Sequence, residues 1–148
     1  MGIRDLLTET TVRVPVLGRT KPSVLRELVD MLAAHGRISD AQGAYNALMA
    51  REEQGSTGLQ AGIAVPHCKC GAVSGLTVAA GVSPQGVEFD SLDGKPARVF
   101  FLIIAAPHQT AAHLEALSEI ARLARQEGFI EALAASLSPK DFIARFAS

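Results

Sequence analysis

The sequence places an imidazole directly after a short apolar segment and a proline. His67 follows Pro66, and residues 63–65 before them are apolar. Proline fixes its own φ and restricts the residue before it, so the backbone that presents this imidazole is stiff on both sides. A neutral imidazole is a nitrogen nucleophile near pH 7, so His67 could take part in nucleophilic chemistry. The alternative is a half-buried histidine that merely ends a strand.

Two further side chains could act beside His67. Arg51 falls near the end of an expected helix, and His113 falls in the first turn of another. The positive end of a helix disfavours imidazolium and favours a nearby anion, so we expect His113 to stay neutral and to hold the tautomer of a second histidine. Simpler interpretations exist for both: Arg51 as a surface cation at a helix C-terminus, and His113 as a helix-start histidine without a partner.

The segment between the expected helix and the apolar residues before Pro66 is rich in small residues. Gly58 and Gly62 leave space for an anionic group to approach the backbone. The hydroxyl of Ser56 or Thr57 could donate a hydrogen bond to that group. We therefore expect these four residues, together with Pro66, to support a bound anionic group such as phosphate.

Two cysteines follow the histidine, at Cys68 and Cys70, and could be taken for part of a zinc or copper site. In an extended segment both cysteines would point to one side and His67 to the other, which disfavours joint ligation. No second cluster of cysteine and histidine completes a tetrahedral set. We expect no metal here, although a ligand- or metal-binding regulatory module without catalysis remains an alternative of another class.

The elements that position these residues follow from apolar periodicity. Ser39 with Gln42 forms a capping-box pattern, and Thr110 is an expected N-cap. Helices are expected at residues 22–35, 40–54, 111–127, 130–135 and from 139 onward, and strands at 11–14, 63–65, 76–82, 87–89 and 99–104.

The order of these elements indicates the fold class. The unbroken apolar run at 99–104 is typical of a central strand that is covered on both faces. A turn is expected at residues 83–86, between two of the strands. Helices before, between and after the strands predict an α/β sandwich: one domain over residues 1–148, with a mixed central sheet and helices on both faces.

Composition excludes several classes of function. The 148 residues carry 14 basic and 15 acidic side chains, and no run of lysine or arginine suits nucleic acid or an anionic membrane. The longest apolar stretch, residues 99–106, is too short to cross a bilayer, and the first residues lack the pattern of a signal peptide. We expect a cytoplasmic protein that does not insert into membranes.

Two blocks of the sequence resemble a known family. The first runs from Arg51-Glu52 through Ser56-Thr57-Gly58 to Gly62-Ile63-Ala64-Val65-Pro66-His67, and the second joins residues 101–107 to residues 113–117. Both are similar to enzyme IIA domains of the bacterial phosphotransferase system, in the fructose, mannitol and nitrogen-regulatory superfamily. The similarity covers essentially the whole chain. It departs at Gln60-Ala61, where the family usually has Gly-Asn, and at Cys68-Lys69-Cys70.

The resemblance implies a specific activity. His67 would be the phosphoacceptor, attacking the phosphohistidine of the carrier protein HPr or of its nitrogen-branch paralogue. His113 would orient the phosphorylated imidazole, and Arg51 would help to neutralise the transferring phosphoryl group. The chain would be a phosphotransferase with a phosphohistidine intermediate, and the family uses no metal or organic cofactor for this step.

The resemblance leaves two destinations for the phosphoryl group. Sugar-transporting members pass it to a IIB protein, and the length of this sequence leaves no room for a IIB or a membrane IIC domain. This favours the nitrogen-regulatory type, which binds target proteins according to its phosphorylation state. A free-standing IIA subunit of a fructose- or mannitol-type transporter is the alternative.

Overall fold

A five-stranded mixed sheet forms the centre of the computed structural model, which describes residues 2–147. The strand order is β1-β4-β5-β2, and β3 also pairs with β5. β5 lies antiparallel to β4 and parallel to β2 and β3, while β1 is parallel to β4. The strands span Val12–Arg13 (β1), Ile63–Ala64 (β2), His67–Lys69 (β3), Thr77–Val87 (β4) and Ala97–Ala105 (β5).

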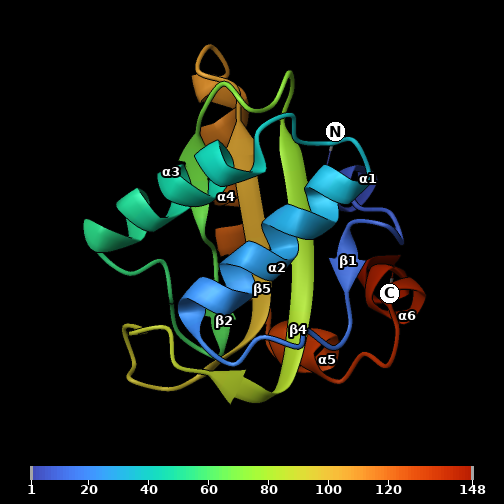
Figure 1. The fold of residues 1–148 in the computed structure, drawn as a ribbon. Coiled ribbons are helices and arrows are strands. Elements are labelled where there is room, and N and C mark those ends of the chain that lie inside the picture. The colour runs from blue at the N-terminus through green and yellow to red at the C-terminus, as the bar shows by residue number, and fades with distance from the viewer. Residues whose placement is uncertain (1, 148) are drawn as a thin grey trace.

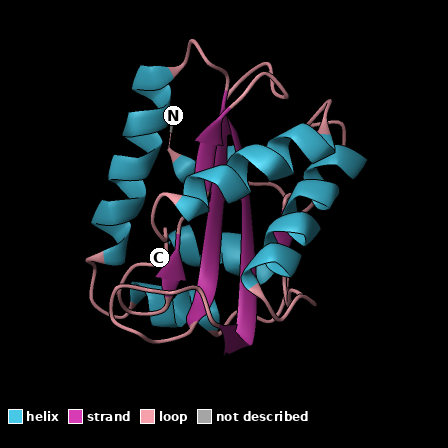
Figure 2. Cartoon of the chain, turned by 60° about the vertical axis from the view of Figure 1, so that its left-hand side comes forward, coloured by secondary structure: helices cyan, strands magenta, loops and turns pink. Residues whose placement is uncertain are grey.

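Helices cover both faces of this sheet (Figures 1 and 2). One face carries α2 (Lys21–Ala34) and α3 (Ala41–Glu53). The other carries α1 (Ile3–Leu6), α4 (Thr110–Ala124), α5 (Phe129–Ala134) and α6 (Pro139–Ala144), and a 3-10 turn at Arg145–Ala147 follows. The predicted α/β sandwich with a mixed central sheet is confirmed.

β5 is the strand that both halves of the core share. Phe100, Leu102 and Ile104 pack with α2 and α3, whereas the residues between them pack with α4 to α6. Every one of these side chains is buried, so neither face of the strand tolerates polar residues. This explains the unbroken apolar run, and it confirms the expected central strand.

The alternation of side chains between the two faces of the sheet also determines on which face His67 lies. Along the segment that leads to His67, Ala64 and Cys68 pack in the core beneath α2 and α3, while Ile63 and Val65 pack in the core beneath α4. Side chains on a strand alternate between faces, so His67 belongs to the α4 side of the sheet. Lys69, two residues further on, belongs to that side as well.

The strand near His67 differs from the prediction. A strand was expected at 63–65 with His67 after its end, but β2 stops at Ala64 and His67 begins a second strand, β3. Pro66 has no N–H to donate, so pairing is interrupted there, and its carbonyl accepts from the Ile103 N–H at 3.0 Å. His67 is thereby held between two strand pairings with β5.

The turn predicted at residues 83–86 is wrong. Strand β4 continues through this segment, with an irregularity in pairing between Val82 and Val87. Val87 still pairs with Ala97 of β5. Gly86 takes a φ of 85°, so the glycine serves an irregular strand rather than a reversal of the chain.

Two helix starts are shifted by one residue. Asp40, not Ser39, caps α3, because its carboxylate accepts from the Gly43 N–H at 2.9 Å. Thr110 is the first residue of α4 rather than its N-cap. Gln109 takes the cap position, and its side-chain oxygen accepts from the Ala106 N–H instead of a helix N–H. The Thr110 hydroxyl is therefore not used for capping.

Candidate functional site

The His67 imidazole is half-buried at the start of β3. Its Nδ1 lies 2.8 Å from the carbonyl oxygen of Val65. A carbonyl can only accept, so Nδ1 carries the proton and donates it. In the neutral ring the lone pair then resides on Nε2, the nitrogen a phosphoryl group could bond.

Several groups around His67 shift its basicity. Burial lowers the pKa of His67 below its ordinary value of 6.5, and the positive charge of Arg51 lowers it further. The hydrogen bond to Val65 and the negative charge of Glu52 oppose the shift without reversing it. The ring is therefore mostly neutral at pH 7, the state in which Nε2 is a nucleophile.

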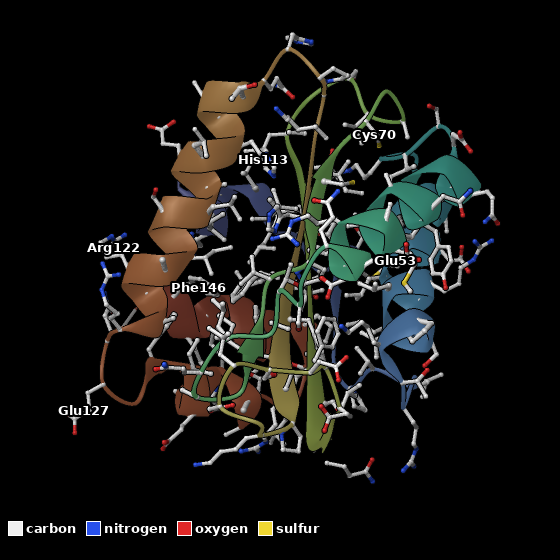
Figure 3. All side chains as sticks on the ribbon, turned by 90° about the vertical axis from the view of Figure 1, so that its left-hand side faces the viewer. Glu53, Cys70, His113, Arg122, Glu127 and Phe146 are labelled. Atoms are coloured by element: carbon white, nitrogen blue, oxygen red, sulfur yellow. The ribbon has the colours of Figure 1, made fainter. Side chains whose placement is uncertain are left out.

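A second imidazole lies against the first. His113 is buried in the first turn of α4, and the two ring centroids are 5.3 Å apart with their planes at 59°. Figure 3 shows His113 on the side of α4 that faces the sheet. Its Nε2 is fully buried and has no hydrogen-bond partner among the described residues. Buried polar atoms normally have a hydrogen-bond partner, so a bound group could supply the partner of this nitrogen.

The neutrality predicted for His113 has a different main cause. Burial is the largest effect that lowers the pKa of His113, and the charges of His67 and Lys69 lower it further. The helix terminus was the expected cause. Both imidazoles are thus held in the neutral form by their surroundings.

Arg51 lies in the last turn of α3 and lines a hollow of about 220 Å³ with His67. Its Nη1 donates to the carbonyl oxygen of Gly55 at 2.8 Å, which holds the guanidinium near the end of the helix. Both polar and apolar side chains line the hollow, and three of the apolar ones belong to α4. The lining residues are Arg51, Ser56, Thr57, Leu59, Val65, His67, Leu117, Ile120 and Ala121.

The two hydroxyls proposed for phosphate binding are engaged inside the protein. Ser56 Oγ donates to the carbonyl oxygen of Phe89 and accepts from the Gly58 N–H at 2.9 Å. Thr57 Oγ1 donates to the carboxylate of Glu52. The hydrogens expected to reach an anion are thus used to shape the loop, and both residues act on its conformation.

The two glycines of this loop also serve its conformation. A Cβ at Gly58 would lie 2.5 Å from the Ser91 Oγ, so the backbone approaches that residue too closely for any side chain. Gly62 has a φ of 83°, in the left-handed region that favours glycine. Glycine is therefore required by close packing at Gly58 and by backbone geometry at Gly62, and the expected role of leaving room for an anion stays a prediction.

Ala61 carries strain in the same loop. Its φ is 60° although it has a side chain, and it stands where the resembling family usually has asparagine, which tolerates this conformation better. We expect Ala61→Gly to raise the free energy of unfolding by roughly 0.5–1 kcal/mol, because relieved strain exceeds the entropy that glycine adds to the unfolded chain.

Urea denaturation measures the effect of Ala61→Gly. The matched control is Ala50→Gly, at an exposed position inside α3, where glycine should instead cost about 1 kcal/mol. An Ala61→Gly protein that loses stability as Ala50→Gly does would contradict the strain at this position.

Sequence reasoning missed an ion pair beneath the loop. Lys21 Nζ lies 2.9 Å from Glu52 Oε1, with side chains 14% and 3% exposed. The Glu52 carboxylate also accepts from both the N–H and the hydroxyl of Thr57. The Nζ of Lys21 also lies 4.8 Å from the ring centroid of Phe89. The glutamate of the Arg51-Glu52 pair was the available signal, since a charged residue inside a resembling block suggests a partner.

The side chains of the two cysteines lie on the opposite face of the sheet from the imidazole of His67. Cys68 is buried in the core beneath α2 and α3, and Cys70 packs against that core. Burial and the neighbouring Cys70 raise the pKa of Cys68 to about 12, so its thiol stays protonated at neutral pH. Within residues 2–147, no group of three or more histidine, cysteine, aspartate or glutamate side chains is arranged to hold a metal ion. Nor does any helix in this range have the length and apolarity to cross a bilayer.

Removing the guanidinium should change the titration of His67. We expect Arg51→Gln to raise the pKa of His67, because a positive charge that disfavours imidazolium is lost. NMR titration of the imidazole protons measures the shift. Arg37→Gln, an exposed position in the loop after α2, is the control and should leave the pKa of His67 unchanged. An unchanged pKa in Arg51→Gln would contradict the proximity of the two charges.

Comparison with known proteins identifies relatives of two named kinds. The fructose-specific EIIABC component of Bacillus subtilis is 39% identical over 86% of this chain, which spans 20% of that protein's length. The fructose-specific EIIA component of Haloferax volcanii is 35% identical over 90% of this chain and 88% of its own. The nitrogen regulatory protein of Pseudomonas aeruginosa is 35% identical over 82% of this chain and 79% of its own.

Solved structures agree with the fold. The nitrogen regulatory protein IIA-Ntr of Neisseria meningitidis superposes with a TM-score of 0.87, at 29% identity, over 97% of both chains. Enzyme IIA-mannitol of Escherichia coli, solved in complex with phosphorylated enzyme IIB-mannitol, superposes with a TM-score of 0.80 at 24% identity, over 95% of this chain and 96% of its own. The family model for EIIA 2 of the phosphoenolpyruvate-dependent sugar phosphotransferase system matches residues 5–148. The chain therefore belongs to the enzyme IIA family of the phosphotransferase system.

Proposed function

We propose that this chain is a single phosphoryl-carrier domain that works in the cytoplasm and carries the phosphoryl group on Nε2 of His67. The observation that carries the proposal is the hydrogen bond from Nδ1 to the Val65 carbonyl. That bond fixes the tautomer, so Nε2 keeps its lone pair at the edge of a hollow that Arg51 also lines. No proton has to leave the acceptor before the reaction.

The transfer balances without a further reactant. The lone pair of His67 Nε2 forms the new N–P bond while the P–N bonding pair returns to the donor imidazole, which carries a proton on its other ring nitrogen and so leaves as a neutral imidazole. Nδ1 of His67 keeps its proton throughout and donates it in the hydrogen bond to the Val65 carbonyl oxygen. Arg51 and His113 would contact the oxygens of the transferring group, which is supported by the place of Arg51 in the hollow beside His67 and by the 5.3 Å between the two imidazole ring centroids. The protein contributes position and charge, which is what phosphoryl transfer requires.

The donor would be HPr or an HPr-like phosphocarrier protein, and the phosphorylated chain would then act on a second protein. Similarity in fold to the Neisseria meningitidis IIA-Ntr, with a TM-score of 0.87, supports a nitrogen-regulatory output through binding of target proteins. The 39% identity to a fructose-specific component supports the second candidate, a IIA subunit that passes the phosphoryl group to a IIB protein.

Phosphorylation with purified components tests the proposal. The chain is incubated with phosphoenolpyruvate, enzyme I and HPr, and intact mass and NMR then report how many phosphoryl groups it carries and on which nitrogen. We expect one acid-labile group on Nε2 of a histidine. A protein that gains no phosphoryl group, or gains it on Nδ1, would overturn the mechanism.

A second step separates the two outputs. A fructose-type IIB protein is then added to the phosphorylated chain. The phosphoryl label should stay on the chain if the output is regulatory, and should be transferred to the IIB protein if the chain serves a transporter. Native mass spectrometry with and without chelator tests the alternative class. A stoichiometric metal would favour a metal-binding regulatory module.

A further inference from the structure

Lys69 is a cation on the same side of the sheet as His67. Both belong to β3, whose pairing with β5 matches His67 to Ile103 and Lys69 to Ala105. Cys68 between them points into the opposite core. Residues two apart on a strand lie on one face at a Cα separation of about 6.6 Å. The Lys69 stem is long enough to bring its ammonium to the imidazole of His67.

The ammonium of Lys69 forms a neutral, exposed hydrogen bond. Its Nζ donates to the Thr110 Oγ1 at 3.1 Å, at the start of α4. No carboxylate of residues 2–147 forms an ion pair with it, in contrast to Lys21. The charge of Lys69 is also one of the effects that lower the pKa of the neighbouring His113. The cation therefore acts on His113, lies on the same strand face as His67, and forms no ion pair within residues 2–147.

We propose that Lys69 is a phosphoryl-binding residue, which exchanges its bond to Thr110 for a bond to the phosphoryl group on His67. The inference rests on the proposed function, since it needs a phosphorylated His67. A phosphoryl group brings close to two negative charges to a site where Arg51 reaches from the end of α3 and Lys69 from beside the start of α4. Bonds between an ammonium and a phosphoryl oxygen are stronger than neutral hydrogen bonds.

This arrangement predicts an effect on equilibrium rather than on docking. A cation that contacts only the phosphorylated form stabilises that form and shifts phosphoryl exchange with the donor toward this chain. A cation that contacts only the donor protein would change the rate but not the equilibrium between the separated proteins. Because the site is exposed, we expect the contribution of Lys69 to be about five- to tenfold in the equilibrium constant.

The test measures the equilibrium constant of phosphoryl exchange between HPr and the whole chain, with NMR detection of both phosphoproteins. Lys69→Gln should lower it about five- to tenfold, and Lys69→Arg should restore most of it. Lys140→Gln, which removes an exposed lysine at α6, is the matched control and should leave it unchanged. The difference in this equilibrium constant between wild type and Lys69→Gln should shrink in high salt. The urea midpoint of unfolding should be the same for Lys69→Gln as for wild type.

The outcomes separate this inference from the proposed function. If the wild type is phosphorylated and Lys69→Gln has the same equilibrium constant, the role of Lys69 is refuted and the carrier function stands. If only the forward and reverse rates fall together, Lys69 contacts the donor protein and the inference is again refuted. If the wild type accepts no phosphoryl group, the proposed function and the inference fall together.

Discussion

The His67→Gln protein is expected to accept no phosphoryl group from phosphorylated HPr. Glutamine is close to histidine in size and keeps a polar side chain at a half-buried position, so the fold should survive. Its amide nitrogen has no available lone pair, however, and cannot form a bond to phosphorus. Acid-labile label should therefore fall to background, whereas a residue with a supporting role would only slow the reaction.

His113→Gln is the comparison that gives this result its meaning. Loss of the buried imidazole removes one polar contact from the charge that develops during transfer, and the expected cost is about 10²- to 10³-fold in rate. Rapid-quench measurement of a single turnover distinguishes a slow reaction from none. Label retained in His67→Gln would contradict His67 as the acceptor. If His113→Gln then carried no label at all, the roles of the two imidazoles would be exchanged.

The proximity of the candidate site residues was predicted better than their contacts. His67, His113 and Arg51 were proposed from their places near element ends and from two blocks that resemble a family. Whether they take part in phosphoryl transfer stays a prediction, although the structure places the two imidazoles 5.3 Å apart. The hydroxyls of Ser56 and Thr57 were assigned to a phosphate because a sequence does not show the carbonyl and the carboxylate that engage them.

The fold was predicted where local pattern and tertiary structure agree. The central strand β5 follows from its apolar run, since both of its faces are buried. The segment 83–86 shows the opposite case, because Pro84 and Gly86 are typical of a turn and yet pairing of Val87 with Ala97 keeps the chain in the sheet. Contacts with a partner strand outweigh turn propensity there, and such contacts join residues far apart in sequence.

The sequence could signal that Glu52 has a partner, but it could not show that the partner is Lys21, for the same reason. The two residues are 31 positions apart and belong to the first turn of α2 and the last turn of α3. Only the packing of these helices on one face of the sheet brings them together (Figure 1). Thr57 then joins the pair to the loop before His67, so a contact far from the imidazole in sequence supports the backbone that presents it.

Glu52→Ala is expected to lower the free energy of unfolding by about 3 kcal/mol, because a nearly buried lysine loses its nearest counter-charge and two donors of Thr57 lose their acceptor. The cost is at the lower end for a broken buried pair, since Lys21 keeps a carboxylate of Asp90 at 3.4 Å. Urea denaturation gives the value. Glu53→Ala, at the exposed next position of α3, is the matched control and should change stability by about 0.5 kcal/mol or less.

A double variant shows whether the loss comes from the unpaired charge. Lys21→Met combined with Glu52→Met removes both charges and fills the space with apolar atoms, so it should recover much of the stability that Glu52→Ala loses. Glu52→Ala should also lower the pKa of His67 further, since a negative charge that favours imidazolium is gone. Equal stability of Glu52→Ala and Glu53→Ala would show that the buried pair contributes nothing to the fold, and the loop before His67 would then depend on its own hydrogen bonds alone.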